Sequence, residues 1–176
     1  MVDLPLSLAS NDFQLFGIPE QYALSTADLD TKWKALQREA HPDKFAAQGA
    51  TAQRLAMQWS VRINEAYQRL KDPLKRAAYL CELRGAPINA ENNTAMPAAF
   101  LMQQIEWREA ADEATSDGQI ETLLAEVSAL KKNLLAQCGF ALDEENEPDA
   151  TYDKASSLVR SLMFLGKFES ELEDRL

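Results

Sequence analysis

The stretch Thr31-Lys-Trp-Lys-Ala-Leu-Gln-Arg-Glu-Ala-His-Pro-Asp-Lys44 decides how this chain folds, because a helical pattern stops inside it at a proline. Pro42 lacks the amide hydrogen that a helix interior needs, and its ring clashes with the preceding turn. It also keeps His41 out of the helical region of backbone conformation. The tripeptide His41-Pro-Asp43 is therefore expected to be a surface loop between two antiparallel helices, and loops on rigid scaffolds often carry function.

Helical patterns lie on both sides of this tripeptide. Upstream, Ser25-Thr-Ala-Asp28 has the form of a capping box, and Leu29 and Trp33 begin an apolar stripe at helical spacing. Downstream, Trp59 belongs to a similar stripe on a longer helix, so both tryptophans are predicted core residues. Capping and breaking signals add a short helix before this pair and another after it. The predicted helices are residues 11–16, 25–40, 50–71 and 72–84.

The second half of the chain has a different composition. Residues 1–88 carry a net charge of +1, whereas residues 89–176 carry −11. Three further helical patterns, at about 97–115, 118–137 and 149–175, follow a turn-rich segment at 86–96 that is interpreted as a linker. Short connections between three helices predict an antiparallel bundle. The charge asymmetry predicts two modules with different partners.

Several kinds of function are excluded or disfavoured by composition. A net charge of −10 argues against nucleic-acid binding, which needs cations against phosphate. Nothing approaches the roughly 18 apolar residues of a membrane span, and no secretory signal opens the chain, so a reducing cytoplasm is expected. Cys81 and Cys138 stand far apart and are interpreted as buried thiols. Without a metal-ligand set, a glycine-rich phosphate loop or a paired nucleophile and base, no enzyme activity and no cofactor are predicted.

The helix predicted at 97–115 has more apolar surface than a small bundle needs. Trp107 and Ala111 lie within about 20° of Phe100 and define the stripe that faces the bundle. A second apolar group lies on the far side, beside a row of glutamates. It consists of Leu101, Met102 and Ile105, and the row is Glu106, Glu109 and Glu113. Phe164 of the last helix also falls outside the bundle-facing stripe of that helix. Either another helix or a partner protein covers such a patch.

The first half of the chain resembles the J-domain of the DnaJ-type co-chaperones, through His41-Pro-Asp43 between two helices and through the block Asn64-Glu-Ala-Tyr-Gln-Arg-Leu-Lys-Asp-Pro-Leu-Lys-Arg-Ala-Ala-Tyr79. The resemblance implies that Asp43 meets an arginine of a DnaK-type chaperone, which is a directional pair. A simpler alternative is that Asp43 caps the turn through its own backbone. The chaperone-binding residues that the resemblance implies are Lys32, Lys34, Arg38, His41, Pro42, Asp43 and Lys44. The basic side chains among them are expected to point outward from the second helix.

With its acidic second half, the chain is similar to the HscB family, the specialised co-chaperones of iron–sulfur cluster assembly. Segments that carry this resemblance are Leu15-Phe-Gly-Ile-Pro19, His41-Pro-Asp-Lys-Phe45, Arg76-Ala-Ala-Tyr-Leu80 and Phe100-Leu-Met102. The resemblance implies that the C-terminal module binds the cluster scaffold protein and delivers it to a dedicated DnaK-type chaperone, whose ATPase the J-domain stimulates. The implied scaffold-binding residues are Leu101, Met102, Ile105, Glu106, Glu109, Glu113 and Phe164.

The expected architecture is all-α and L-shaped. A J-domain helical hairpin at 1–85 is followed by the linker at 86–96 and by a three-helix domain at 97–176. Two departures from general J-domains stand out, Ala40 in place of a tyrosine and Leu80 in place of an aspartate. Two alternatives to the expected function stay open. The first is a J-domain adaptor for a different client, and the second is a helical interaction module without ATPase stimulation.

Overall fold

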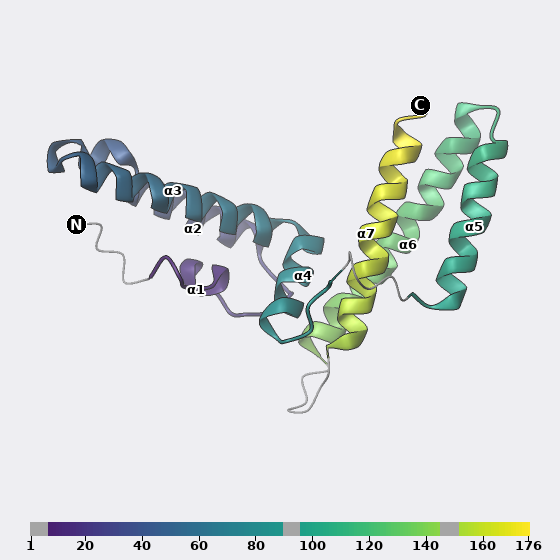
Figure 1. Cartoon of the computed structure of the whole chain (residues 1–176), viewed down its shortest axis with the longest axis horizontal. Coiled ribbons are helices and arrows are strands. Elements are labelled where there is room, and N and C mark those ends of the chain that lie inside the picture. The colour runs from purple at the N-terminus through teal and green to yellow at the C-terminus, as the bar shows by residue number, and fades with distance from the viewer. Residues whose placement is uncertain (1–6, 90–95, 145–151) are drawn as a thin grey trace. The chain divides into compact units, whose positions relative to one another are not determined.

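The computed structural model describes residues 7–89, 96–144 and 152–176, and every regular element in these ranges is a helix (Figure 1). The predicted all-α fold class is confirmed. The α-helices are α1 (Asp12–Phe16), α2 (Thr26–Glu39), α3 (Ala50–Lys71), α4 (Pro73–Leu83), α5 (Ala98–Glu113), α6 (Asp117–Asp143) and α7 (Asp153–Glu173), and one 3₁₀-helix, η1, spans Pro42–Gln48. Residues 90–95 of the predicted linker, and residues 145–149 of the acidic stretch before the last helix, lie outside the described residues.

Packing divides the chain into two compact units, residues 1–76 and 77–176, and the division falls within α4. Ala77, Leu80 and Cys81 of this helix have no exposed surface and count with the second unit. The predicted domain boundary after residue 85 and the L-shaped arrangement stay predictions. In the described part of the chain, no helix is both long and apolar enough to cross a bilayer.

The first unit is built around the pair of long helices α2 and α3, which Figure 1 shows running alongside each other. Leu29 of α2 and Ile63 of α3 are completely buried, and burying a large side chain is worth roughly 1.5–3 kcal/mol before entropy is subtracted. Trp59 is a core residue, as predicted. Trp33 is only half-buried, because its Nε1–H donates to Asn64 Oδ1 at the edge of the helix pair. The indole therefore keeps a polar partner at the rim of the core.

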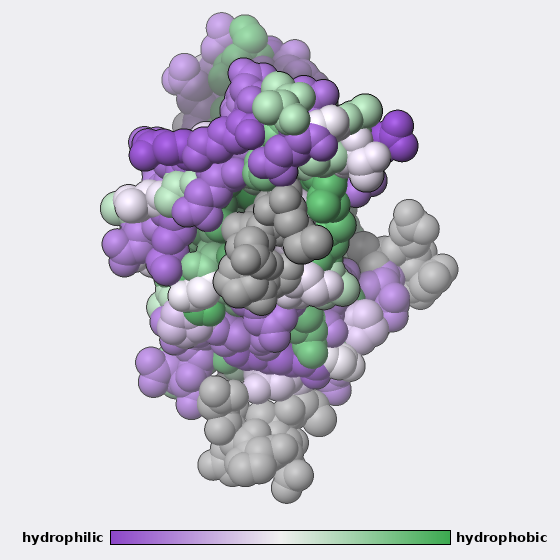
Figure 2. Space-filling model, turned by 90° about the vertical axis from the view of Figure 1, so that its left-hand side faces the viewer, coloured by the Kyte–Doolittle hydropathy of each residue, from purple (hydrophilic) through white to green (hydrophobic). Residues whose placement is uncertain are grey.

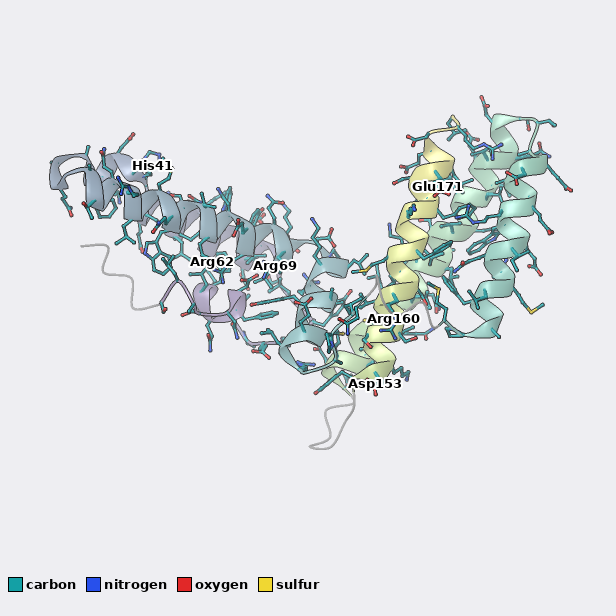
Figure 3. The ribbon with its side chains drawn as sticks, in the orientation of Figure 1. His41, Arg62, Arg69, Asp153, Arg160 and Glu171 are labelled. Carbon is teal, nitrogen blue, oxygen red and sulfur yellow. The ribbon has the colours of Figure 1, made fainter. Side chains whose placement is uncertain are left out.

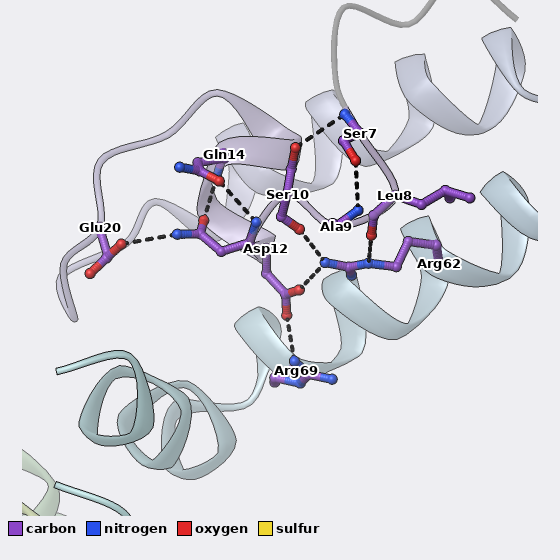
Figure 4. A network of polar contacts seen from close by, with 10 residues as sticks. Ser7, Leu8, Ala9, Ser10, Asp12, Gln14, Glu20, Arg62 and Arg69 are labelled. Carbon is purple, nitrogen blue, oxygen red and sulfur yellow. Dashed lines mark hydrogen bonds and ion pairs between the residues drawn. The ribbon is translucent and has the colours of Figure 1, made fainter. Parts of the chain in front are cut away.

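Helix α1 is held to α3 by a buried ion-pair network that the sequence analysis did not identify (Figure 4). Asp12 has no exposed surface, and its two carboxylate oxygens lie 2.8 Å from Arg62 Nη2 and 3.3 Å from Arg69 Nη1. Arg62 Nη2 also donates to the carbonyl of Ser10 at 2.8 Å. Since a charge without a partner is costly to bury, this network fixes where the N-terminal helix can sit. Gly17, with φ of +58°, ends the helix in the left-handed conformation.

The second unit contains the predicted three-helix bundle of α5, α6 and α7 (Figure 1). Trp107 and Ala111 face its core, as the angular analysis predicted, and Phe100 packs against them from the edge. Helix α6 was predicted to end near residue 137 but continues to Asp143. It continues because Cys138 and the two residues Ala141-Leu142 are buried, so the apolar face extends past Gly139.

Two arginines, Arg84 and Arg160, tie the segment that follows α4 to α6 and α7 (Arg160 is labelled in Figure 3). Arg84 donates to the carbonyl of Leu142, and its guanidinium lies 4.9 Å from the centre of the Tyr152 ring. Arg160 of α7 donates to the carbonyl of Ile88 at 3.2 Å. The first of these bonds satisfies a main-chain carbonyl at the end of α6, and the second satisfies one in the segment after α4; such groups are costly to bury without a partner.

The two cysteines of this unit are free and buried, as predicted. Burial raises the pKa of the Cys81 thiol to about 11 and that of Cys138 to about 12, because a thiolate is poorly solvated there. Both thiols are therefore protonated near neutral pH and act as small apolar side chains.

Candidate functional site

The predicted loop at His41 is in fact a capped 3₁₀-helix. His41 is the N-cap of η1, with extended backbone angles of φ −65° and ψ 127°, and Pro42 occupies the first helical turn. The loop prediction was wrong in this detail because proline, which cannot continue α2, is well suited to begin a new helix. The connection between α2 and α3 is thus a short and ordered element, and it holds His41 at the end of the helix pair (Figure 3).

Within this element Asp43 is presented to solvent. Its side chain is 91% exposed, and its amide donates a hydrogen bond to His41 Nδ1 at 3.2 Å. The alternative that Asp43 caps its own turn is therefore wrong, because His41 provides the cap instead. The nearest Asp43 carboxylate oxygen lies 3.6 Å from the same ring nitrogen. We call the segment His41-Pro-Asp43 the capped turn; its backbone is fixed from within and its carboxylate is available to another molecule.

The basic residues predicted around the capped turn divide into two groups. Lys34, Arg38 and Lys44 are exposed, as expected for outward-facing side chains. Lys32 is half-buried, and its Nζ lies 3.4 Å from the carbonyl oxygen of Gly17, so its predicted outward position is wrong. Its ammonium is used to bond the end of α1, which lies beside this part of α2. Figure 2, a view from the left-hand side of Figure 1, shows that much of the face on that side is hydrophilic.

The second candidate surface is the exposed side of α5. Leu101 is 43% exposed, Met102 64% and Ile105 58%, so all three large apolar side chains stand open to solvent. The glutamates predicted beside them, Glu106, Glu109 and Glu113, are exposed as well. We call these six residues the α5 ridge. The opposite side of the same helix carries Trp107 into the core, and the ridge residues are not part of that core cluster.

Phe164 was predicted to lie outside the bundle-facing stripe of its helix, but its side chain is partly buried in the bundle. It is half-buried and packs against the bundle core, with its ring edge-to-face with Phe100 at a centroid distance of 6.2 Å. The guanidinium of Arg108 lies 5.5 Å from the centre of the Phe164 ring. The helical angle placed Phe164 off the main stripe, but a large ring at the edge of a bundle reaches the neighbouring helix.

Arg108 is a residue of this region that the sequence analysis missed. Besides its contact with Phe164, its guanidinium lies 5.3 Å from the ring centre of Phe168 and 3.3 Å from a carboxylate oxygen of Glu171. It thereby joins α5 to α7 by cation–π contacts and an ion pair. No sequence signal identifies it, because an arginine beside a core tryptophan is read as an ordinary solvated charge.

Metal binding has no candidate in the described part of the chain, where no three His, Cys, Asp or Glu side chains are grouped as ligands. The capped turn and the α5 ridge lie in different compact units. One displays a carboxylate, and the other displays apolar side chains beside carboxylates.

Comparisons with known proteins identify relatives over nearly the whole chain. A family model described as "HSCB C-terminal oligomerisation domain" matches residues 96–173. A protein of Burkholderia thailandensis named "Co-chaperone protein HscB homolog" is 45% identical over 170 residues, which cover 95% of this chain and 94% of the relative. A homologue of the same name from Burkholderia multivorans is 46% identical with the same coverage.

Solved structures give a consistent result. The chaperone HscB from Vibrio cholerae is 33% identical, with a TM-score of 0.76 over 94% of this chain and 96% of that one. The human co-chaperone protein HscB superposes with a TM-score of 0.87 over 97% of this chain and 84% of that one. At 24% identity, this second likeness concerns the fold alone.

Proposed function

The chain belongs to the HscB family of co-chaperones, and on that premise we propose that it brings the scaffold protein of iron–sulfur cluster assembly to a DnaK-type chaperone and stimulates the ATPase of that chaperone. The chain itself carries out no reaction in this proposal. It works in the cytoplasm, with residues 1–85 as the J-domain, 86–96 as a linker and 97–176 as the scaffold-binding domain.

The observation that carries the chaperone half of the proposal is the exposure of Asp43 on the capped turn. A carboxylate that is 91% exposed, on a backbone fixed by His41 and Pro42, is well placed to form a bidentate pair with an arginine of another protein. Lys34, Arg38 and Lys44 add exposed positive charge, which steers the encounter with an acidic face. Lys32, which bonds Gly17, contributes to this surface mainly by holding α1 in place.

The scaffold half of the proposal rests on the α5 ridge. Leu101, Met102 and Ile105 offer adjacent apolar surface, and an exposed patch of this kind marks a contact site for another protein. The glutamates beside them favour a partner with positive charge at the rim of its apolar surface. Phe164 supports the ridge from the bundle edge, and its exposed part completes the contact area.

Stimulation in this proposal is allosteric. A protein that contacts a chaperone shifts its equilibrium only if it binds one conformational state better than another. The Asp43 contact must therefore be stronger in the state of the chaperone that hydrolyses ATP. Delivery of the scaffold raises its local concentration next to the chaperone, which adds to the effect without a new contact.

Reconstitution from purified components tests both halves. The wild-type chain is added to a DnaK-type chaperone and to the scaffold, separately and together, and single-turnover ATP hydrolysis is followed. We expect acceleration by the chain alone and a larger acceleration when the scaffold is also present. No acceleration by the chain would contradict the chaperone half, and no binding of the scaffold by calorimetry would contradict the other half.

A different client is the alternative for the second unit, and a further copy of this chain is one such client. The family model that matches residues 96–173 is described as an oligomerisation domain, and the α5 ridge is apolar enough to associate with itself. Self-association would bring the two glutamate rows near one another, however, which disfavours it by like-charge repulsion. Light scattering after size-exclusion chromatography distinguishes the two alternatives. A monomer is expected, and a dimer that the variant Ile105→Glu dissociates would favour self-association.

A further inference from the structure

A hollow of about 160 Å³ lies between the C-terminal parts of α5 and α7, and none of its lining residues belongs to the α5 ridge. Figure 3 shows Glu171, one of the lining residues, near the C-terminal end of α7. The hollow lies within the second compact unit. We call it the α5–α7 hollow. The sequence analysis assigned none of its residues to a binding surface.

Apolar side chains form the floor of the hollow. Ala111 is 3% exposed, Phe168 3% and Leu172 1%, so only a small part of each reaches the opening. A buried water molecule needs about two to four polar partners, and these three side chains provide none. The volume is close to that of an engineered apolar cavity that accommodates benzene. The hollow therefore suits one large apolar side chain better than it suits water.

The rim of the hollow is charged but carries no net charge. Its cations are Arg108 and Arg175, and its carboxylates are Asp112 and Glu171. Arg108 is held by its 3.3 Å ion pair with Glu171 and by the Phe168 ring, whose centre lies 5.3 Å from the guanidinium. A wall that is already fixed loses less entropy when a partner binds. Apolar shape, rather than the sign of charge, therefore selects what enters the hollow.

The hollow continues one side of the α5 ridge. Leu101, Ile105, Arg108 and Asp112 follow one another at intervals of four, three and four residues, which places them along one face of α5. From Ile105 to Asp112 the distance along the helix axis is about 10 Å, because each residue advances by about 1.5 Å. A partner that lies along Leu101 and Ile105 therefore meets the hollow within about two further helical turns.

We propose that the α5–α7 hollow receives one large apolar side chain of the iron–sulfur scaffold protein, from the segment that covers Leu101 and Ile105. The inference rests on the proposed function, because it requires the scaffold to lie along the ridge. It adds an anchor in a preformed depression to a contact whose other apolar residues are exposed on the helix surface. Buried anchors of this kind carry much of the binding energy of an interface.

Charge disfavours a second copy of the chain as the occupant. Residues 89–176 carry a net charge of −11, and a segment that enters the hollow from the ridge passes beside the glutamate row Glu106, Glu109 and Glu113. Another acidic unit is repelled there, whereas a partner with positive charge beside its apolar residues is attracted. The proposed scaffold contact has this second character.

Intermolecular NOEs on the wild-type chain test the proposal directly. The methyl groups of alanine, isoleucine and leucine are labelled with ¹³C, and unlabelled scaffold is added to saturation. NOEs from scaffold protons are expected at Ala111 and Leu172, in addition to those at Leu101 and Ile105. NOEs at Leu101 and Ile105 alone would overturn the proposal and leave the proposed function standing. If no methyl group shows an NOE or a shift, the scaffold does not bind, and both fail.

Dilution of the labelled chain without scaffold tests the other occupant. The signals of Ala111 and Leu172 are expected to be independent of the concentration of the chain. Signals that shift with concentration, together with NOEs between copies at Leu172, would assign the hollow to a second copy and overturn the proposal.

A chemical block measures what the hollow contributes to affinity. Arg175 is exposed at the rim, and Arg175→Cys allows a maleimide with an aromatic ring to be attached there. Cys81 and Cys138 do not react, because both are buried and burial raises their pKa values to about 11 and about 12. Modification is expected to weaken scaffold binding by about tenfold or more, the change that loss of one large buried side chain produces.

The matched control carries the same maleimide on Lys132→Cys, at an exposed position of α6. Its dissociation constant for the scaffold, measured by calorimetry, is expected to stay within a factor of about two of the unmodified value. Unmodified Arg175→Cys shows the effect of the substitution alone. Equal affinities of the modified and unmodified Arg175→Cys variants would show that the hollow stays empty in the complex and would overturn the proposal.

Discussion

The capped turn and the α5 ridge are built in opposite ways. In the turn, the backbone of three residues is fixed by one hydrogen bond and one proline, and a single carboxylate is presented. In the ridge, a regular helix presents three apolar side chains, none of which is positioned by a bond of its own. A directional polar contact depends on one group, whereas an apolar contact depends on area. The turn should therefore fail at a single substitution, and the ridge should weaken by degrees.

The largest effect is expected at the turn. Asp43→Ala should abolish ATPase stimulation, because the proposed ion pair between the Asp43 carboxylate and an arginine of the chaperone can no longer form. The thermal midpoint should change little, since the Asp43 side chain is exposed and its amide, which the substitution keeps, makes the capping bond. Asp43→Asn is the matched control for shape and should lose stimulation equally. Normal stimulation by either variant in a steady-state assay would remove Asp43 from the proposed contact.

The ion-pair network of Asp12, Arg62 and Arg69 gives the next largest effect. Asp12→Ala should leave Arg62 and Arg69 without their buried partner and should lower the free energy of unfolding of the first unit by about 3–5 kcal/mol. Urea denaturation followed by hydrogen exchange in α1 and α3 measures the change. Asp28→Asn, in an exposed carboxylate of α2, is the control and should stay within about 0.5 kcal/mol. A comparable loss in both variants would show that the Asp12 network has no special role in stability.

At the ridge a graded loss is expected. Leu101→Ala combined with Ile105→Ala should weaken scaffold binding about tenfold to a hundredfold, through lost apolar area, while ATPase stimulation by the chain alone is unchanged. Met57→Ala with Val61→Ala, two exposed apolar residues of α3, is the matched control. Calorimetric titration measures both pairs. Equal affinities for the ridge pair and the wild-type chain would contradict the assignment of the ridge.

Phe164→Ala sharpens the same point. Its ring packs on Phe100 and lies under Arg108, so its removal should lower the thermal midpoint as well as scaffold affinity. Leu101→Ala combined with Phe164→Ala should then weaken scaffold binding and also destabilise the bundle, while the capped turn still stimulates the chaperone. Circular dichroism on melting separates the two contributions. A midpoint equal to that of the wild-type chain would mean that Phe164 acts only through contact with the scaffold.

The smallest effect is expected for the glutamates. Glu109→Gln should weaken scaffold binding only a few-fold, mainly through slower association. Charges at the rim of an interface affect the association rate more than the dissociation rate. The difference from the wild-type chain should shrink as salt is raised, since exposed charges are screened. Stopped-flow association at low and high ionic strength measures this. A difference that persists at high salt would indicate a direct, buried contact instead.

Most of the fold was predictable because periodicity and end signals agreed. The bounds predicted for the third helix, residues 50–71, are those of α3, and Ser25 caps α2 by accepting from the Asp28 amide. The end of α6 was missed, because Gly139 and the acidic residues after it resemble a helix end. The burial of Leu142 against other parts of the second unit keeps the helix intact, and a local sequence window does not contain that information.

The candidate site was predictable to the extent that it depends on exposure of one helix face. The angles that placed Leu101, Met102 and Ile105 opposite Trp107 were confirmed by their exposed fractions. The positions of Lys32 and Phe164 were not predicted correctly, because each side chain reaches a residue distant in sequence. Lys32 reaches the carbonyl of Gly17, and the ring of Phe164 reaches Phe100. The role of His41 as a cap could not be predicted from the sequence. The bond joins the Asp43 amide to one of the two ring nitrogens of His41, and only the structure shows which nitrogen accepts it.

The separation of the two surfaces is the central claim, and one titration tests it. The scaffold protein is titrated by calorimetry into the Asp43→Ala variant, which should no longer stimulate the chaperone. The dissociation constant should equal that of the wild-type chain within a factor of about two, since the α5 ridge does not include Asp43. A dissociation constant that rises together with the loss of stimulation would contradict the assignment of two independent surfaces.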